Sequence, residues 1–202
     1  MKKKNIFRVV TASFLLFILS VTGPAFSQNS KETRLIDDSK NAQSEFVKSD
    51  SLMQSLFTNS YGYVIFPNVG KGAIGIGGAA GNGIVFEKGT PIGSAKMKQV
   101  SIGFQFGGQA YREVIFFENQ AALDRFKQNN FEFSAQASAV AVTKGASTNV
   151  KYRDGVMVFT QEKGGLMYEA SVGGQKFDYS AFWRRHKEVF VRMTYLGSHA
   201  PK

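Results

Sequence analysis

Apolar residues are spaced differently in the two parts of this chain, and the spacing changes near residue 60. Between residues 31 and 48 they recur every three to four positions in a polar background, which predicts an amphipathic helix. These apolar positions are Leu35, Ile36, Ala42, Phe46 and Val47. Ser51-Leu52-Met53-Gln54 resembles a capping box and predicts a short second helix through Phe57. We expect these helices to pack on a sheet; binding of the first one to a membrane surface is the alternative.

From Tyr61 the spacing changes to two, which is typical of β-strands. The runs that predict strands are 61–66, 84–86, 100–106, 114–117, 131–141, 156–161 and 166–172. Pro67-Asn68 and Glu87-Lys88-Gly89-Thr90 predict turns. Lys163-Gly164-Gly165 predicts that the last two strands form a hairpin.

One further helix interrupts the strands. Asn119 predicts the N-cap of a helix that runs to about Asn129 and buries Ala122, Leu123 and Phe126. The whole pattern predicts an α+β fold with one β-rich domain, whose antiparallel sheets are sandwich or barrel-like, and about three flanking helices. We expect a helical segment over 28–60 packed on this domain, the β-rich domain over 61–178, and a separate C-terminal segment over 179–202.

Residues 1–27 have the three parts of a cleavable signal peptide. Its positive charges are Lys2, Lys3, Lys4 and Arg8. The apolar stretch over 9–21 has 13 residues, fewer than the ~20 that a spanning helix needs, and Ala25-Phe26-Ser27 fits a small-x-small cleavage site. An uncleaved anchor is the alternative. We therefore expect an exported protein, periplasmic or membrane-peripheral in a diderm bacterium, with an extracellular location as the alternative.

The positive charge lies mainly at the two ends of the chain. The sequence has 25 Lys and Arg against 15 Asp and Glu, a net charge of +10. Four of the cations belong to the predicted signal peptide, and the last 24 residues carry a net charge of +4. A nearly balanced body in an exported protein excludes nucleic acid as the expected partner, whereas an anionic membrane surface stays compatible. The absence of cysteine excludes disulfides, thiolate metal sites and a lipoprotein anchor.

Seven of the fourteen residues from 70 to 83 are glycine. Gly70-x-Gly72-x-x-Gly75 has the form of a dinucleotide-binding fingerprint, but it follows a Pro-Asn pair and no helix is expected after it. We interpret the glycines as sites of close backbone packing between strands. Contact of their N–H groups with a phosphate-bearing headgroup, beside Lys71, is compatible with this. The structural glycines are Gly70, Gly72, Gly75, Gly77, Gly78, Gly81 and Gly83.

Residues suited to catalysis or metal binding are few. His186 and His199 have no patterned Asp or Ser partner, and no spacing of His, Asp and Glu indicates a metal site. Asp37-Asp38 occupy adjacent helical positions that point in different directions, so we interpret them as solvated. We therefore expect no catalytic residue, no cofactor and no metal; an unrecognised hydrolase is the enzymatic alternative.

The C-terminal segment separates into apolar and basic faces if it forms a helix from Ser180. Its cations are Arg184, Arg185, Lys187 and Arg192. We favour docking of this helix on the domain over contact with an anionic bilayer. Alternation of apolar residues from Val189 to Tyr195 allows a terminal strand instead.

Three glycine-containing segments follow one another along the chain. The first is Gly62-Tyr63-Val64-Ile65-Phe66-Pro67-Asn68-Val69-Gly70-Lys71, with the glycines after it. The second is 101–109, SIGFQFGGQ, and the third is 161–167, QEKGGLM, followed by Gly173-Gly174. In this order they resemble the first glycine region, the second glycine strand and the final hairpin of the SYLF family, and the resemblance runs from about Leu52 to Tyr179. It implies phospholipid binding, which in eukaryotic relatives is binding to phosphoinositides, and in some of those relatives actin regulation.

For an exported protein, the corresponding ligand is anionic phospholipid of the cell envelope. We therefore predict a non-catalytic protein that binds phosphate-bearing headgroups at an envelope membrane. The residues predicted to meet the headgroups are Lys71, Lys96, Lys98, Arg184, Arg185, Lys187 and Arg192. A protein–protein interaction or scaffold module without a lipid role is the alternative.

Overall fold

A computed structural model gives the fold, and it describes residues 23–182 except 75, 103–108, 130, 135–137 and 164–169. The helices in that part of the chain are α2 (Gly23–Ser49), α3 (Met53–Asn59), α4 (Gln120–Lys127) and a 3-10 turn, η1 (Ala146–Asn149). The strands are β1 (Gly62–Ile74), β2 (Ile76–Glu87), β3 (Thr90–Ile102), β4 (Gln109–Phe117), β5 (Phe131–Glu132), β6 (Ser138–Ala141), β7 (Val156–Glu162), β8 (Ala170–Ser171) and β9 (Gln175–Ala181). The predicted α+β class is confirmed.

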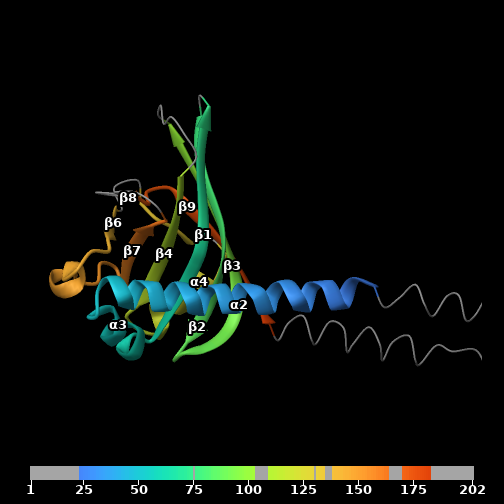
Figure 1. Ribbon diagram of the computed structural model, residues 1–202, viewed down its shortest axis with the longest axis horizontal. Coiled ribbons are helices and arrows are strands. Elements are labelled where there is room, and N and C mark those ends of the chain that lie inside the picture. The colour runs from blue at the N-terminus through green and yellow to red at the C-terminus, as the bar shows by residue number, and fades with distance from the viewer. Residues whose placement is uncertain are drawn as a thin grey trace, which may run out of the picture.

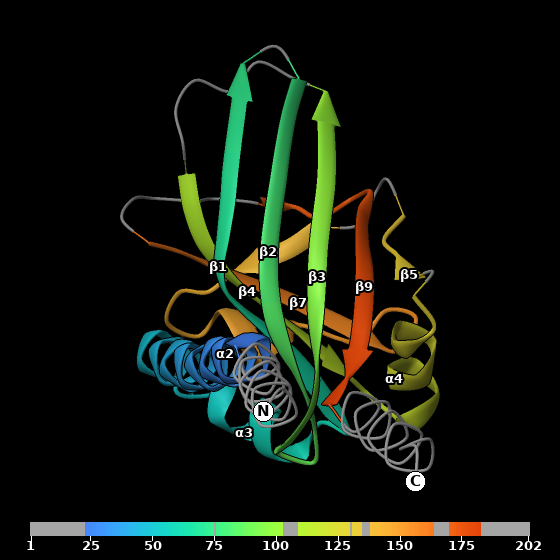
Figure 2. The ribbon, with the colours of Figure 1, turned by 90° about the vertical axis from the view of Figure 1, so that its right-hand side faces the viewer.

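The described strands form one sheet in the order β5-β9-β3-β2-β1-β4-β7-β6-β8. Neighbouring strands are antiparallel, except that β6 runs parallel to β7. The sheet curls back on itself, so that β7 passes behind β2 and β3 in Figure 2. Phe66 of β1 and Phe177 of β9 therefore meet, with ring centroids 5.8 Å apart, although two strands lie between them in the sheet order. The result is a half-barrel with a concave inner face.

The outer face of the half-barrel is covered by α2 and α3 (Figure 1). Phe46 of α2 and Phe57 of α3 are buried against this face. The Phe57 ring lies 5.1 Å from Tyr63 and 4.9 Å from Phe116, both edge-on. The predicted helical stretch thus packs on a sheet, because its apolar stripe matches the outward-pointing residues of β1 and β4.

The inner face packs around α4. Asn119 is its N-cap and accepts the backbone N–H of Ala122 at 3.0 Å, as predicted. Ala122, Leu123 and Phe126 are buried, which confirms the predicted inner face of this helix. The Phe126 ring lies 5.1 Å from Phe117 and 5.3 Å from Phe177. One end of the half-barrel is therefore filled with aromatic side chains.

Two predicted local features are wrong at the start of the β-rich region. Pro67-Asn68 is not a turn, because β1 continues through it and its register on β2 shifts between Ile65 and Asn68. A proline cannot donate to a strand ladder, and a bulge in a central strand accommodates it. Ser51 does not cap α3, whose N-terminal boundary has no side-chain cap. Asp50 supplies the local acceptor instead, taking the N–H of Leu52 at 3.1 Å.

The strand predictions for the second half of the chain are correct only in part. Residues 131–141 are not one strand: they contain β5 at one end of the sheet and β6 near the other. The described part of the predicted hairpin does not form, since β8 pairs with β6 while β7 pairs with β4 and β6. The divided stretch and the missing hairpin both depend on which distant strands pair with each other. Alternation of apolar and polar residues along the sequence does not indicate which strand a given strand pairs with.

The ends of the chain leave several predictions untested. Helix α2 begins at Gly23 and so includes the predicted cleavage site, but cleavage itself stays a prediction. Residues up to Ala181 belong to β9, so a helix from Ser180 is wrong at its start. The rest of the basic segment, 183–202, lies outside the described residues. No helix within the described residues is long and apolar enough to cross a membrane.

Candidate functional site

The lysines predicted to meet headgroups are only partly brought together. Lys96 and Lys98 are exposed on β3. Lys98 lies opposite Lys176 of β9, whereas Lys96 lies opposite Asp178, so a carboxylate accompanies this cationic group. Lys71 is on β1, with its side chain outside the described set. The four predicted tail cations, Arg184, Arg185, Lys187 and Arg192, lie outside the described residues.

The glycine-rich segment forms two antiparallel strands, β1 and β2, rather than the strand, turn and helix of a dinucleotide site. A Cβ at Gly83 would come within 2.5 Å of the carbonyl oxygen of Ile65 and 2.7 Å of the Phe66 ring. At Gly81 it would come within 3.1 Å of the carbonyl oxygen of Asn68. At Gly70, by contrast, a Cβ would have no neighbour within 4 Å. Close backbone packing thus requires glycine at some of these positions and not at others.

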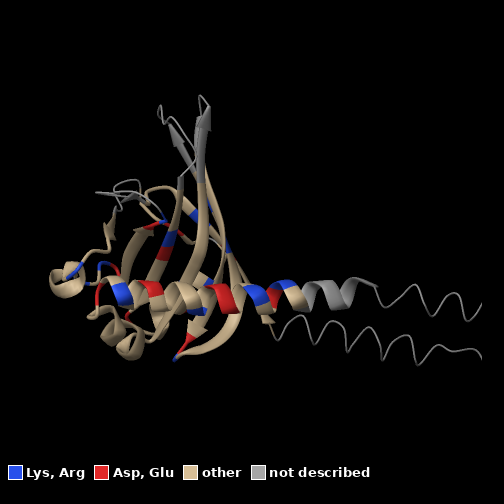
Figure 3. Cartoon of the chain, viewed as in Figure 1, with Lys and Arg blue, Asp and Glu red and all other residues tan. Residues whose placement is uncertain are grey.

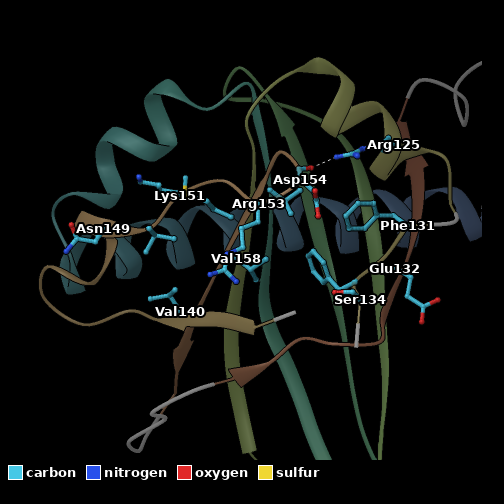
Figure 4. A pocket seen from close by; sticks show the side chains of 14 residues that line it. Arg125, Phe131, Glu132, Ser134, Val140, Asn149, Lys151, Arg153, Asp154 and Val158 are labelled. Carbon is cyan, nitrogen blue, oxygen red and sulfur yellow. Dashed lines mark hydrogen bonds between the residues drawn. The ribbon is translucent and has the colours of Figure 1, made fainter. Parts of the chain in front are cut away.

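A pocket of about 860 Å³ lies where the two ends of the curled sheet approach each other (Figure 4). One wall comes from β5 and the residues after it, 131–134. The other wall comes from Val140 of β6 and from residues 149–158, which include the loop before β7 and the start of β7. Arg125 of α4 also lines the pocket. Because β5 stands at one end of the strand order and β6 and β7 stand near the other, we call this the seam pocket.

The seam pocket combines apolar walls with cations. Its apolar lining is Phe131, Phe133, Val140, Val150, Val156, Met157 and Val158. Three cations line it as well, and Arg125, Lys151 and Arg153 are all exposed. Elsewhere the cations are interspersed with acidic residues, as along α2 (Figure 3). Such a surface suits a ligand with an apolar body and an anionic group.

The carboxylates at the pocket neutralise its cations incompletely. Glu132 pairs with Lys176 of β9 at 3.3 Å, which directs this carboxylate to a cation outside the lining. Arg125 donates from Nη2 to the backbone carbonyl of Asp154, which ties the loop before β7 to α4. Within the described residues, no ion pair involves Lys151 or Arg153. With Glu132 and Asp154 counted, the lining carries three cations and two carboxylates, which leaves a net charge of +1.

A second polar group lies inside the half-barrel. Glu113 of β4 and Gln175 of β9 are both 0% exposed, and Gln175 Nε2 donates to Glu113 Oε2 at 3.0 Å. Burial raises the pKa of Glu113 to about 7, and the hydrogen bond from Gln175 only partly opposes this. Burial also raises the pKa of Tyr111, and the neighbouring Glu113 charge adds to this. Oε1 of Glu113 and Oε1 of Gln175 have no hydrogen-bond partner in the described structure.

Neither site gathers the side chains of a metal centre within the described residues. No group of three or more His, Asp or Glu side chains within the described residues is placed to hold a metal ion. Glu113 has the perturbed pKa of a catalytic acid, but its side chain is fully buried.

Sequence reasoning missed the seam pocket and its cations. Lys151 and Arg153 stand two positions apart in the segment before β7, and Arg125 is on the exposed side of α4. In the sequence, each therefore resembles an ordinary solvent-exposed charge. Their common location depends on the curl of the sheet, which brings α4 and this loop together. A positively charged pair beside a strand is the only signal that could have indicated them.

The comparisons with known proteins agree with the resemblance found in the sequence. Residues 98–182 match a family model described as Ysc84, Las17-binding protein actin regulator. The chain is also 28% identical over 123 residues to Beta cell expansion factor A of Aeromonas veronii. This alignment covers 60% of the chain and 47% of that protein, so the chain spans about half the length of the curated relative that it matches. The matched residues 98–182 include the whole lining of the seam pocket.

Proposed function

We propose that this chain, which carries a SYLF-family domain, binds anionic phospholipid at a membrane surface and catalyses no reaction. The observation that carries the proposal is the seam pocket, where exposed cations surround apolar walls. The predicted signal peptide supports a location in the cell envelope, where such lipid is the available anionic surface. This location is part of the proposal.

Electrostatics and apolar contact each have a part in this function. Lys151 and Arg153 would attract an anionic surface at roughly 1 kcal/mol per cation. Lys96 and Lys98 are exposed on a separate strand and would add to this attraction. Shallow insertion of apolar groups would then hold the protein at the headgroup boundary.

Vesicle flotation tests the proposal. The full chain without its predicted signal peptide is mixed with phosphatidylcholine vesicles that contain increasing fractions of phosphatidylglycerol. We expect the bound fraction to rise with phosphatidylglycerol and to fall with added salt. Equal binding to neutral and anionic vesicles, or binding to neither, contradicts the proposal.

Paired variants then separate the two cationic groups. Lys151→Gln/Arg153→Gln should weaken binding on the order of thirtyfold, because two cations are lost. Lys96→Gln/Lys98→Gln tests the cations predicted from the sequence. Lys31→Gln/Lys40→Gln, on exposed positions of α2, removes the same charge elsewhere and is the control. A control that loses as much affinity as the seam variant would show that only net charge matters.

A protein-binding module is the second candidate, favoured by the family description, which names binding to the protein Las17. Under this proposal the domain presents a surface to a protein partner and has no lipid role. Co-purification of a stoichiometric partner that resists detergent and salt, together with no flotation on any vesicle, is the result that would support it over lipid binding.

A further inference from the structure

We propose that the seam pocket admits one acyl chain of an anionic amphiphile, with the head of that molecule at Lys151 and Arg153. The proposal rests on the proposed function for the chemistry of the ligand, and it goes further by placing a single molecule inside the fold. A fatty acid, a lysophospholipid and one chain of a membrane phospholipid share this chemistry.

The first support is the gap between the sheet ends. In a closed barrel the end strands would pair through backbone hydrogen bonds and leave no opening. Here β5 pairs with β9, and β6 pairs with β7 and β8; among the described strands no ladder joins β5 to β6, β7 or β8. The two ends face each other across the seam pocket instead. Side chains, not a strand ladder, therefore line this part of the wall.

The second support is the apolar continuity of the seam with the inner core. Phe131 is partly exposed and lines the pocket, and its ring lies 5.3 Å from Phe133, 5.6 Å from Phe126 and 5.9 Å from Phe177. Val156 and Val158 form the facing wall from β7. A methylene chain between these walls would lose contact with water along its length, which the hydrophobic effect favours for each buried CH₂.

The third support is the position of charge at the same opening. Arg125, Lys151 and Arg153 line the pocket from α4 and from the loop before β7, and all three are exposed (Figure 4). The contact of Arg125 with the carbonyl of Asp154 holds this loop beside the helix. Asp154 and Glu132 also line the pocket, and Glu132 pairs with Lys176, so an anionic head would meet a small excess of positive charge while its chain enters between the walls. The volume of about 860 Å³ is within the roughly 300–1,000 Å³ of small-molecule sites.

Calorimetric titration with monomeric lipids tests the inference. The delipidated chain is titrated with oleate, palmitoyl lysophosphatidylglycerol and palmitoyl lysophosphatidylcholine, each below its critical micelle concentration. We expect saturable binding of one oleate or one lysophosphatidylglycerol per chain. Lysophosphatidylcholine should bind roughly tenfold more weakly, because it lacks net negative charge. Absence of saturable binding of the anionic lipids overturns the inference.

Two variants place the ligand in the seam. Ser134→Trp introduces a large side chain at an exposed residue of the pocket lining and should lower affinity at least about tenfold. Thr143→Trp, at an exposed residue outside the lining, is the control and should bind like the wild type. Arg153→Gln should weaken both anionic lipids roughly tenfold and leave lysophosphatidylcholine unchanged. Wild-type affinity in Ser134→Trp overturns the inference; if that variant does not fold, wild-type affinity in Arg153→Gln overturns it.

The vesicle and monomer experiments separate the two proposals. Flotation on anionic vesicles without monomer binding overturns the seam site and leaves surface binding in place. Monomer binding that Ser134→Trp abolishes, without flotation, supports the seam site and overturns surface binding. Loss of both in Ser134→Trp, but not in Thr143→Trp, supports a phospholipid whose chain enters the seam from the bilayer.

Discussion

Two buried carboxyl groups in this protein have pKa values that are shifted in opposite directions. Asp50 is 2% exposed, and its Oδ2 accepts both the backbone N–H of Ser147 at 2.9 Å and the Ser147 hydroxyl at 2.7 Å. Burial raises the pKa of Asp50, but the hydrogen bonds from Ser147 and Leu52 outweigh this and hold it below its ordinary value. Glu113, with one donor from Gln175, has a raised pKa instead. Full burial of Glu113, together with its smaller number of donors, accounts for the difference.

Replacing Asp50 should therefore destabilise the fold. Asp50→Ala leaves the N–H of Ser147 buried without its acceptor and removes the hydrogen bonds that join the α2–α3 connection to η1. We expect a loss of about 3 kcal/mol in the free energy of unfolding in urea. Ser147→Ala removes only the hydroxyl and should cost about 1 kcal/mol. The Asp50 contribution is present above a pH of about 4 and is lost as the pH falls through its lowered folded-state pKa; equal stability of Asp50→Ala and wild type near neutral pH would contradict this.

Glu113 should give the opposite pH dependence. The unfolded chain loses this proton near its ordinary pKa of 4.5, whereas the folded protein keeps it until about 7. The free energy of unfolding should therefore fall as the pH rises across this interval, by at most about 3 kcal/mol. Tyr111 beside it stays neutral there, because its own pKa is raised.

Urea unfolding at about pH 5 and about pH 8 measures this effect. Glu113→Gln keeps an acceptor for Gln175 and cannot ionise, so its stability should change less between the two conditions than that of the wild type. Glu118→Gln, at an exposed position just after β4, is the matched control and should keep the wild-type dependence. A wild-type dependence in Glu113→Gln would show that another group is responsible.

Within single helices and turns, the sequence pattern predicted the conformation where residues close together in the sequence determine it. The cap at Asn119 and the buried face of α4 were predictable because both lie within one helix. The Lys88-Gly89 turn between β2 and β3 was predictable because glycine is favoured where a two-residue turn requires positive φ, which both residues adopt. Pro67 and the divided stretch 131–141 were not, since their conformations depend on partner strands far away in sequence.

The contact between β1 and β2 gives a test at this scale. Gly83→Ala would push its Cβ into the carbonyl of Ile65 and the Phe66 ring, so β2 would have to move away from β1. We expect a loss of about 2 kcal/mol or more in the free energy of unfolding. Gly70→Ala, where a Cβ meets nothing within 4 Å, should change it by less than about 0.5 kcal/mol. Comparable losses in both variants would contradict the packing explanation.

At the scale of the whole molecule, the curl of the sheet creates the features that the sequence did not reveal. Glu113 and Gln175 are 62 residues apart and meet only because β4 and β9 face each other across the inner face. Likewise, Arg125 and Asp154 are 29 residues apart and meet where α4 approaches the loop before β7. Sequence patterns indicated which residues are charged or buried, while the seam pocket depends on how far the sheet closes.

We expect this half-barrel to hold one anionic lipid molecule at its seam. Mass spectrometry of the intact protein under non-denaturing conditions can detect such a complex when the chain is offered equal amounts of phosphatidylglycerol and phosphatidylcholine. We predict a complex with one lipid, mainly phosphatidylglycerol, that is greatly reduced in Ser134→Trp and kept in Thr143→Trp. A protein without bound lipid, or equal complexes with both lipids in all three proteins, would contradict this expectation.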